Sequence, residues 1–78
     1  PNPFNPVTNI SFSVPKSSPV KLNIFNIRGE LVKTVINETK SPGNYQISFD
    51  ASGLSSGIYF YRLETDTGNI IRKMMLCK

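Results

Sequence analysis

Apolar residues recur at every second position along much of this 78-residue chain, and short stretches rich in Pro, Gly, Ser and Asn separate the runs. A period of two places apolar side chains on one face of an extended strand, whereas a helix needs a period near 3.6. The period of two therefore predicts an all-β chain. The predicted strands cover residues 7–14, 20–27, 30–36, 44–50, 58–65 and 70–77.

Turn signals between the runs predict how the strands connect. Arg28-Gly29 is expected to form a tight hairpin turn, because glycine can adopt a positive φ. The polar segment 37–43 is expected to link two strands and to end in the turn pair Pro42-Gly43. Residues 66–69 should form another hairpin turn. Short strands with turns at this spacing are typical of a small antiparallel β-sandwich of six to seven strands.

Alternation also predicts which side chains face the core. In the first strand these are Ile10, Phe12 and Val14, and in the fourth they are Tyr45, Ile47 and Phe49. Leu54 should plug the small-residue loop 51–56.

One local pattern makes the sandwich prediction more specific. Residues 54–61, Leu-Ser-Ser-Gly-Ile-Tyr-Phe-Tyr, resemble the stretch that enters strand F of immunoglobulin domains. On that analogy Tyr59 anchors a corner through its hydroxyl group, and Tyr61 and Leu63 point inward. The outward residues would then be Phe60, Arg62 and Glu64. Alternation alone also permits the opposite facing.

The chain opens with three prolines in residues 1–6 and has no initiator methionine. Proline fixes φ, lacks an N–H donor and pushes the preceding residue toward extended geometry. We therefore expect residues 1–6 to be a stiff lead-in from an upstream passenger, and residues 7–78 to form one domain. On this interpretation the chain is the C-terminal part of a longer protein.

Charge and composition argue against several classes of function. The net charge of +4 comes from nine basic and five acidic residues spread along the chain, whereas nucleic-acid binders usually concentrate basic charge on one face. No apolar run approaches the roughly 20 residues of a membrane-spanning helix. The single cysteine, Cys77, excludes an internal disulfide and is interpreted as filling an apolar strand position, although a reactive thiol or a link between chains stays open.

No catalytic or metal-binding constellation is apparent. The sequence has no histidine, which removes the commonest general base and a frequent metal ligand. Asp50 and Asp66 lie at predicted strand ends, where aspartate commonly stabilises a turn. The chain is therefore predicted not to be an enzyme and to need no cofactor. Carbohydrate binding is not favoured either, because Phe25 and Phe60, the aromatic residues most expected to be exposed, lie on different strands.

Four stretches together resemble the C-terminal sorting domain of the type IX (Por) secretion system of Bacteroidetes and related phyla. The opening motif covers residues 1–12, and a central hairpin motif covers 20–32. A Gly-x-Tyr region covers 49–63, and a closing basic-apolar strand covers 72–78. Arg28 and Cys77 stand where many relatives have an aliphatic residue. The four motifs occur in the family's order and at its spacing.

This resemblance implies an immunoglobulin-like domain that acts as an export address. The passenger would be secreted or placed on the cell surface, by way of the periplasm and the outer membrane. The implied partners are the outer-membrane secretion machinery and a sortase-like peptidase that cuts near the start of the domain. The junction is expected at Pro1, Asn2 and Pro3.

The residues expected to be read by the translocon are Gly57, Tyr59, Lys73 and Lys78. A purely structural role is the stronger interpretation for Gly57 and Tyr59. The two lysines either form a docking edge for strand addition or protect a sheet edge from aggregation.

Two other classes stay open. The immunoglobulin-like domain of the flagellar hook-capping protein shares much of the pattern, but it usually has a Trp-Asp-Gly motif where this chain has Phe49-Asp50-Ala51. A structural, adhesive or carbohydrate-binding accessory module of a secreted enzyme is the third interpretation.

Overall fold

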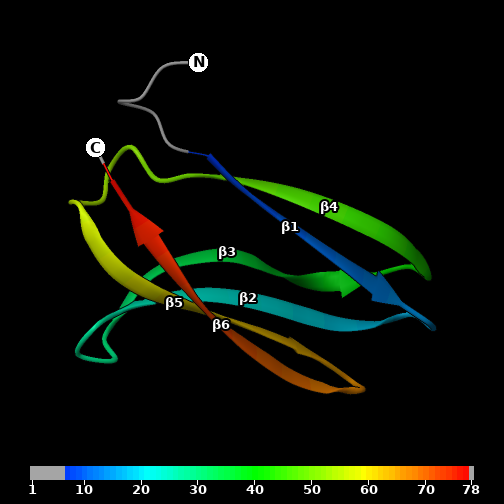
Figure 1. The fold of residues 1–78 in the computed structure, drawn as a ribbon. Coiled ribbons are helices and arrows are strands. Elements are labelled where there is room, and N and C mark those ends of the chain that lie inside the picture. The colour runs from blue at the N-terminus through cyan, green and yellow to red at the C-terminus, as the bar shows by residue number, and fades with distance from the viewer. Residues whose placement is uncertain (1–6, 78) are drawn as a thin grey trace.

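The computed structural model describes residues 7–77 and contains six β-strands and no helix in that range (Figure 1). The strands are β1 (Val7–Val14), β2 (Ser18–Asn26), β3 (Leu31–Lys40), β4 (Gly43–Asp50), β5 (Gly57–Thr65) and β6 (Gly68–Leu76). The prediction of an all-β chain is confirmed, and each predicted strand overlaps one of the observed strands.

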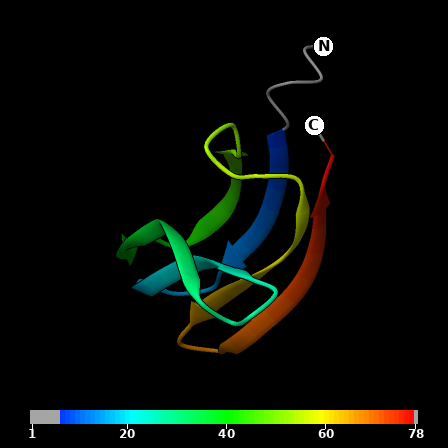
Figure 2. The same cartoon turned by 90° about the vertical axis from the view of Figure 1, so that its left-hand side faces the viewer.

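The strands form two antiparallel sheets that pack as the two layers of a sandwich. One sheet pairs β1 with β4, and the other has the order β3-β2-β5-β6. Figures 1 and 2 show the two-stranded sheet lying across one face of the four-stranded sheet. The chain therefore crosses between layers after β1, after β3 and after β4, while β2–β3 and β5–β6 are hairpins within one layer.

Apolar side chains from both sheets meet between the layers in two clusters. The predicted core residues Ile10 and Val14 are buried in the first cluster, where Phe12 stacks on Tyr45 with ring centroids 5.4 Å apart. Phe49 is buried in the second cluster, and Leu54 packs against it as predicted. The fully buried side chains of largest volume are Phe49, Leu22, Ile24 and Val20. Burial of each stabilises the fold by about 1.5–3 kcal/mol.

β3 differs most from its prediction. The strand was expected to end at residue 36, but it continues to Lys40, because β2 begins at Ser18 and pairs with it up to Ser18↔Lys40. The polar segment after Ile36 is therefore mostly strand rather than connection. Backbone pairing does not depend on apolar side chains. It therefore extends the strand beyond the alternating apolar residues from which its end was predicted.

Pro19 lies inside β2, where proline was expected to break the chain. β2 pairs with β5 only from Lys21 onward, so Pro19 occupies a stretch that has a strand partner on one side only. Proline lacks a backbone donor and is tolerated where one edge of the strand needs none.

The turn between β2 and β3 contains Arg28-Gly29 as predicted, with Gly29 at φ 82°. Its centre is the side chain of Asn26, whose Oδ1 accepts hydrogen bonds from the backbone N–H groups of Arg28 (2.9 Å) and Glu30 (3.0 Å). The Asn26 amide also donates to Glu30 Oε1 at 2.7 Å. One asparagine therefore holds the whole turn.

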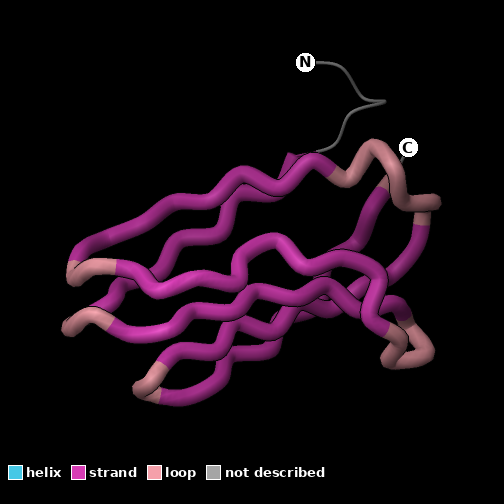
Figure 3. Tube along the Cα trace, turned by 180° about the vertical axis from the view of Figure 1, so that it is seen from behind, coloured by secondary structure: helices cyan, strands magenta, loops and turns pink. Residues whose placement is uncertain are grey.

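Loops gather at the two ends of the sandwich (Figure 3). Val7 pairs with Asp50, Gly57 pairs with Leu76, and the loop 51–56 joins these two pairs. The start of β1, the 51–56 loop and the end of β6 therefore lie at the same end. Cys77 follows β6 and is exposed, so the interpretation that it fills an apolar strand position is wrong.

Candidate recognition site

The β5–β6 hairpin carries three of the residues that the sequence analysis singled out. Gly57 is paired with Leu76, Tyr59 with Met74, and Lys73 with Phe60. Antiparallel pairing of neighbouring strands thus brings together positions up to 19 residues apart in sequence. The other singled-out positions, Lys78 and the junction Pro1, Asn2 and Pro3, lie outside the described residues.

Gly57 opens β5 with φ 152°, a backbone conformation that residues with a side chain rarely adopt. A Cβ built at this position would meet no atom within 4 Å. The position therefore requires glycine for its backbone conformation and not for lack of space.

Tyr59 forms the corner that the immunoglobulin analogy predicts. Its hydroxyl donates to the carbonyl oxygen of Ser55 at 2.8 Å and lies 3.3 Å from Ser55 Oγ. Only 6% of the residue is exposed, and its ring packs in the second core cluster. Tyr61 and Leu63 also pack against the core, so the predicted facing of β5 is confirmed.

The 51–56 loop closes over this corner through local hydrogen bonds. Asp50 Oδ1 accepts from the N–H of Ser52 at 2.9 Å, which is the turn-stabilising role predicted for Asp50. Leu54 N donates to the carbonyl of Ala51 at 3.0 Å. Asp66, the other predicted turn residue, lies in the β5–β6 turn and is 4.0 Å from the Lys16 ammonium.

A hollow of about 430 Å³ lies between this loop and the β2–β3 turn, and Gly57 and Tyr59 are among the residues that line it. The Tyr59 hydroxyl already donates to Ser55, so this residue fixes the shape of this end of the sandwich.

Lys73 lies on the opposite face of the hairpin from Tyr59. It is exposed on β6, a strand at the edge of the four-stranded sheet, and it neighbours Phe60 on the face turned away from β1 and β4. Among the described residues, those predicted for recognition therefore do not form one contiguous patch. Gly57 and Tyr59 shape one end of the sandwich, while Lys73 belongs to its outer face.

The outer face also brings together residues that sequence reasoning kept apart. Phe25 and Phe60 are direct cross-strand partners of β2 and β5, and the Arg62 guanidinium carbon lies 5.2 Å from the centroid of the Phe25 ring. Lying on different strands therefore does not separate Phe25 from Phe60, so that reason against carbohydrate binding is wrong. The missing information was the β2–β5 register, which alternation within single strands does not contain. Since Arg62 covers the Phe25 ring, that ring is not a free stacking platform for a sugar.

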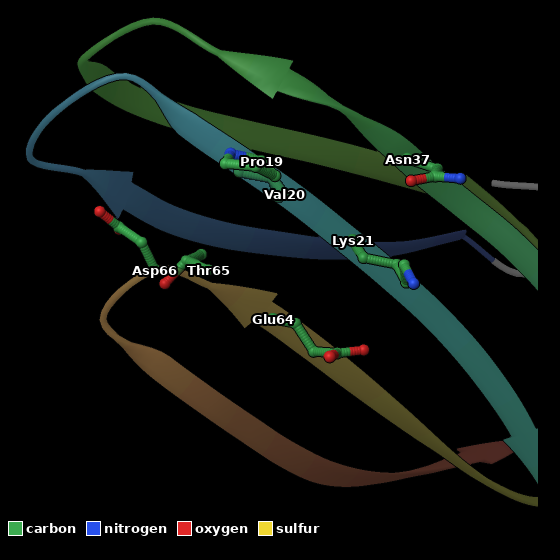
Figure 4. A pocket seen from close by; sticks show the side chains of 7 residues that line it. All are labelled: Pro19, Val20, Lys21, Asn37, Glu64, Thr65 and Asp66. Carbon is green, nitrogen blue, oxygen red and sulfur yellow. The ribbon is translucent and has the colours of Figure 1, made fainter.

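A further hollow of about 350 Å³ opens at the other end of the outer face (Figure 4). Figure 4 shows its lining side chains coming from three neighbouring strands, β2, β3 and β5, and from the turn after β5. They are Pro19, Val20, Lys21, Asn37, Glu64, Thr65 and Asp66. Its charged groups are one ammonium and two carboxylates, without a nucleophile-base pair of the kind that hydrolytic chemistry uses.

Within residues 7–77, His, Cys, Asp and Glu nowhere gather in a group of three that could hold a metal ion. The same range holds no helix of the length and apolarity that a membrane crossing requires.

The described residues form a small antiparallel sandwich with a tyrosine corner at one end. Comparison with family models identifies the family: residues 1–77 match the secretion system C-terminal sorting domain, and the chain belongs to that family. No curated protein and no solved structure matches the chain.

Membership of the family establishes the general role. The domain is a C-terminal sorting signal for type IX secretion and interacts with that machinery. It belongs to proteins exported through the outer membrane to the cell surface or the medium. The expected resemblance and localisation are thereby confirmed.

Proposed function

We propose that residues 7–78 act as a non-catalytic export address for a passenger joined to it through residues 1–6. The family match carries this proposal, because it runs from the proline-rich opening to residue 77 and thus covers both the proposed junction and the last strand. The lack of histidine in the sequence, together with the tyrosine corner, supports a binding role rather than catalysis.

The topology supports a junction at one end of the sandwich. The chain enters β1 at Val7, at the end of the sandwich that also holds the 51–56 loop and the end of β6. A peptidase acting on the segment before Val7 would approach this end. We propose that a sortase-like peptidase of the secretion machinery cuts there, at or near Pro1, Asn2 and Pro3, and separates the passenger from the domain.

Recognition by the machinery is assigned to two regions. Gly57 and Tyr59 would act indirectly, by fixing the shape of the corner, because the Tyr59 side chain is buried. Lys73 is exposed and would act by direct contact, and Lys78 is proposed to act with it.

A fusion experiment tests the proposal. Residues 1–78 are joined to the C-terminus of a periplasm-targeted reporter in a host with a type IX secretion system, and the reporter is assayed in periplasm, surface and medium. We expect it on the surface or in the medium, with the junction cut. Retention in the periplasm, in a host that exports a reporter fused to an established sorting domain, would contradict the proposal.

The last strand is tested in the same host. Deletion of residues 73–78 removes all four β6 partners of the β5 residues from Gly57 to Phe60. It also removes both proposed lysines. Export should be lost. Unchanged secretion of the truncated fusion would show that this strand is not part of the sorting signal.

A further inference from the structure

The outer face of the four-stranded sheet has an apolar half. Inward residues of β2 and β5, such as Ile24 and Leu63, are buried in the core, so their alternating neighbours Phe25, Phe60 and Arg62 face away from β1 and β4. These three residues line a hollow of about 260 Å³ with Gly29 and Ile71. The hollow is large enough to receive a side chain of another protein.

Exposed apolar residues surround this hollow on neighbouring strands. Leu31 is paired with Phe25 and is 55% exposed, and Ile71 is paired with Arg62 and is 59% exposed. Met75, paired with Ile58, is 66% exposed. Isolated apolar residues are normal on a protein surface, but a group that continues across four adjacent strands indicates a binding surface.

Two cations lie within this apolar group. Arg62 stacks on Phe25, and its Nε lies 3.4 Å from Glu64 Oε2. Lys73, next to Phe60, takes part in no ion pair within residues 7–77. The face therefore presents an uncompensated positive charge beside a hollow lined by aromatic and aliphatic groups.

An unpartnered polar group lies next to the hollow. Asn23 is the cross-strand partner of Arg62 on the same face and is 8% exposed, yet its Oδ1 accepts no hydrogen bond from the part of the chain that the structure describes. A buried acceptor without a donor is costly, and such groups usually find a partner. A bound protein can supply the missing donor.

We propose that this outer face, centred on Phe25, Phe60 and Arg62, docks a protein surface that presents an apolar side chain beside a carboxylate. The apolar side chain occupies the hollow, and the carboxylate pairs with Lys73. Aromatic residues and arginine in such packed clusters commonly dominate binding energies. The inference rests on the proposed function, because the partner is the component of the export machinery that reads the domain.

Two other occupants fit less well. If a second copy of the chain docked through the same face, the Arg62 and Lys73 cations of the two copies would face each other. Glu64, a carboxylate on this face, already pairs with Arg62. An anionic lipid surface would satisfy the cations, but it has no rigid side chain to fill a hollow and no donor fixed at Asn23.

The inference is tested by measuring the amount of exported reporter for fusions in which exposed residues of this face are substituted. Lys73→Glu and Ile71→Gln should each lower the amount of exported reporter about tenfold, as loss of a central contact does. Lys73→Arg should keep export near the wild-type level. Lys16→Glu, the matched control, makes the same charge change at a side chain that is 80% exposed, and it should leave export unchanged.

The outcomes separate this inference from the proposed function. If the wild-type fusion is not exported, the proposed function fails. If the wild-type fusion is exported and Lys73→Glu and Ile71→Gln are exported equally well, the outer-face inference is wrong. Circular dichroism of each purified variant checks that folding is retained.

Photo-crosslinking identifies the occupant. A photoreactive phenylalanine analogue at Ile71 should form an adduct with a protein subunit of the type IX machinery, and the yield should fall about tenfold with Lys73→Glu. The same analogue at Lys16 should form little of that adduct. Adducts only with lipid, adducts only with a second copy of the chain, or equal yields from both positions would overturn the proposal.

Discussion

The hydroxyl of Tyr59 donates a 2.8 Å hydrogen bond to the backbone carbonyl of Ser55, four residues earlier in the chain. This bond links the 51–56 loop to the start of β5. It lies at the end of the sandwich where β1 begins and β6 ends. The end that is proposed to meet the export machinery is therefore held by a buried side chain. Loss of the bond should loosen the loop without removing the core.

Replacement of Tyr59 by phenylalanine removes only this hydroxyl. We expect the free energy of unfolding to fall by about 0.5–1.5 kcal/mol, since the bond is partly buried and its net contribution is of that size. Urea denaturation of the chain measures the change. Tyr45→Phe is the matched control, because Tyr45 also donates to a carbonyl four residues earlier, that of Ser41, but at an exposed site. A larger loss for Tyr45→Phe than for Tyr59→Phe would contradict the role of the corner.

Gly57→Ala should destabilise the domain through the backbone. At φ 152° an alanine is strained, and we expect a loss of about 1–2 kcal/mol in the free energy of unfolding. Gly53→Ala is the control in the same loop region, where no such φ occurs and a Cβ would also meet nothing within 4 Å. Thermal unfolding followed by circular dichroism compares the two. Equal midpoints would mean that the glycine conformation at the start of β5 is not required.

Asn26→Ala should weaken the β2–β3 hairpin. The substitution removes two side-chain acceptor bonds to backbone N–H groups and one donor bond to Glu30, so we expect a loss of about 1–2 kcal/mol. Hydrogen exchange of the amides of Arg28 and Glu30 should become faster. Asn44→Ala, which removes a single exposed bond to Ser13, should change stability by less than about 0.5 kcal/mol. Unchanged exchange at the turn in Asn26→Ala would disprove the role assigned to this side chain.

Leu22→Ala tests the core between the layers. Leu22 is fully buried in the first cluster, so its truncation should cost about 2–5 kcal/mol, a large share of the stability of a small domain. Leu31→Ala makes the same change at a side chain that is 55% exposed and should cost less than about 0.5 kcal/mol. Equilibrium denaturation gives both values. Similar losses for the two leucines would show that the layers do not pack as described.

The sequence predicted the strands well because alternation reports local geometry. Ile10, Val14 and Phe49 face the core as their spacing requires, and the turn at Arg28-Gly29 is where glycine permits it. The extension of β3 to Lys40 was missed because backbone hydrogen bonds to Ser18 and its neighbours, not apolar side chains, define it.

The candidate site was less predictable than the fold. Gly57 and Tyr59 could be singled out from a local pattern, and the corner bond follows from it. The outer face depends on which strands are neighbours and in what register, as with Phe25 and Phe60. These relationships join residues 35 positions apart in sequence, and single-strand alternation cannot provide them.

We propose that residues 1–78 are a sufficient signal for the type IX machinery to carry an attached passenger through the outer membrane. The most direct measurement is the fraction of a reporter fused to residues 1–78 that external protease or antibody can reach on intact cells, or that appears in the medium. It is measured in a type IX-competent strain and in an isogenic strain without a working translocon. We predict that most of the reporter is outside in the first strain and that it stays periplasmic in the second. Equal distribution in the two strains would contradict the account.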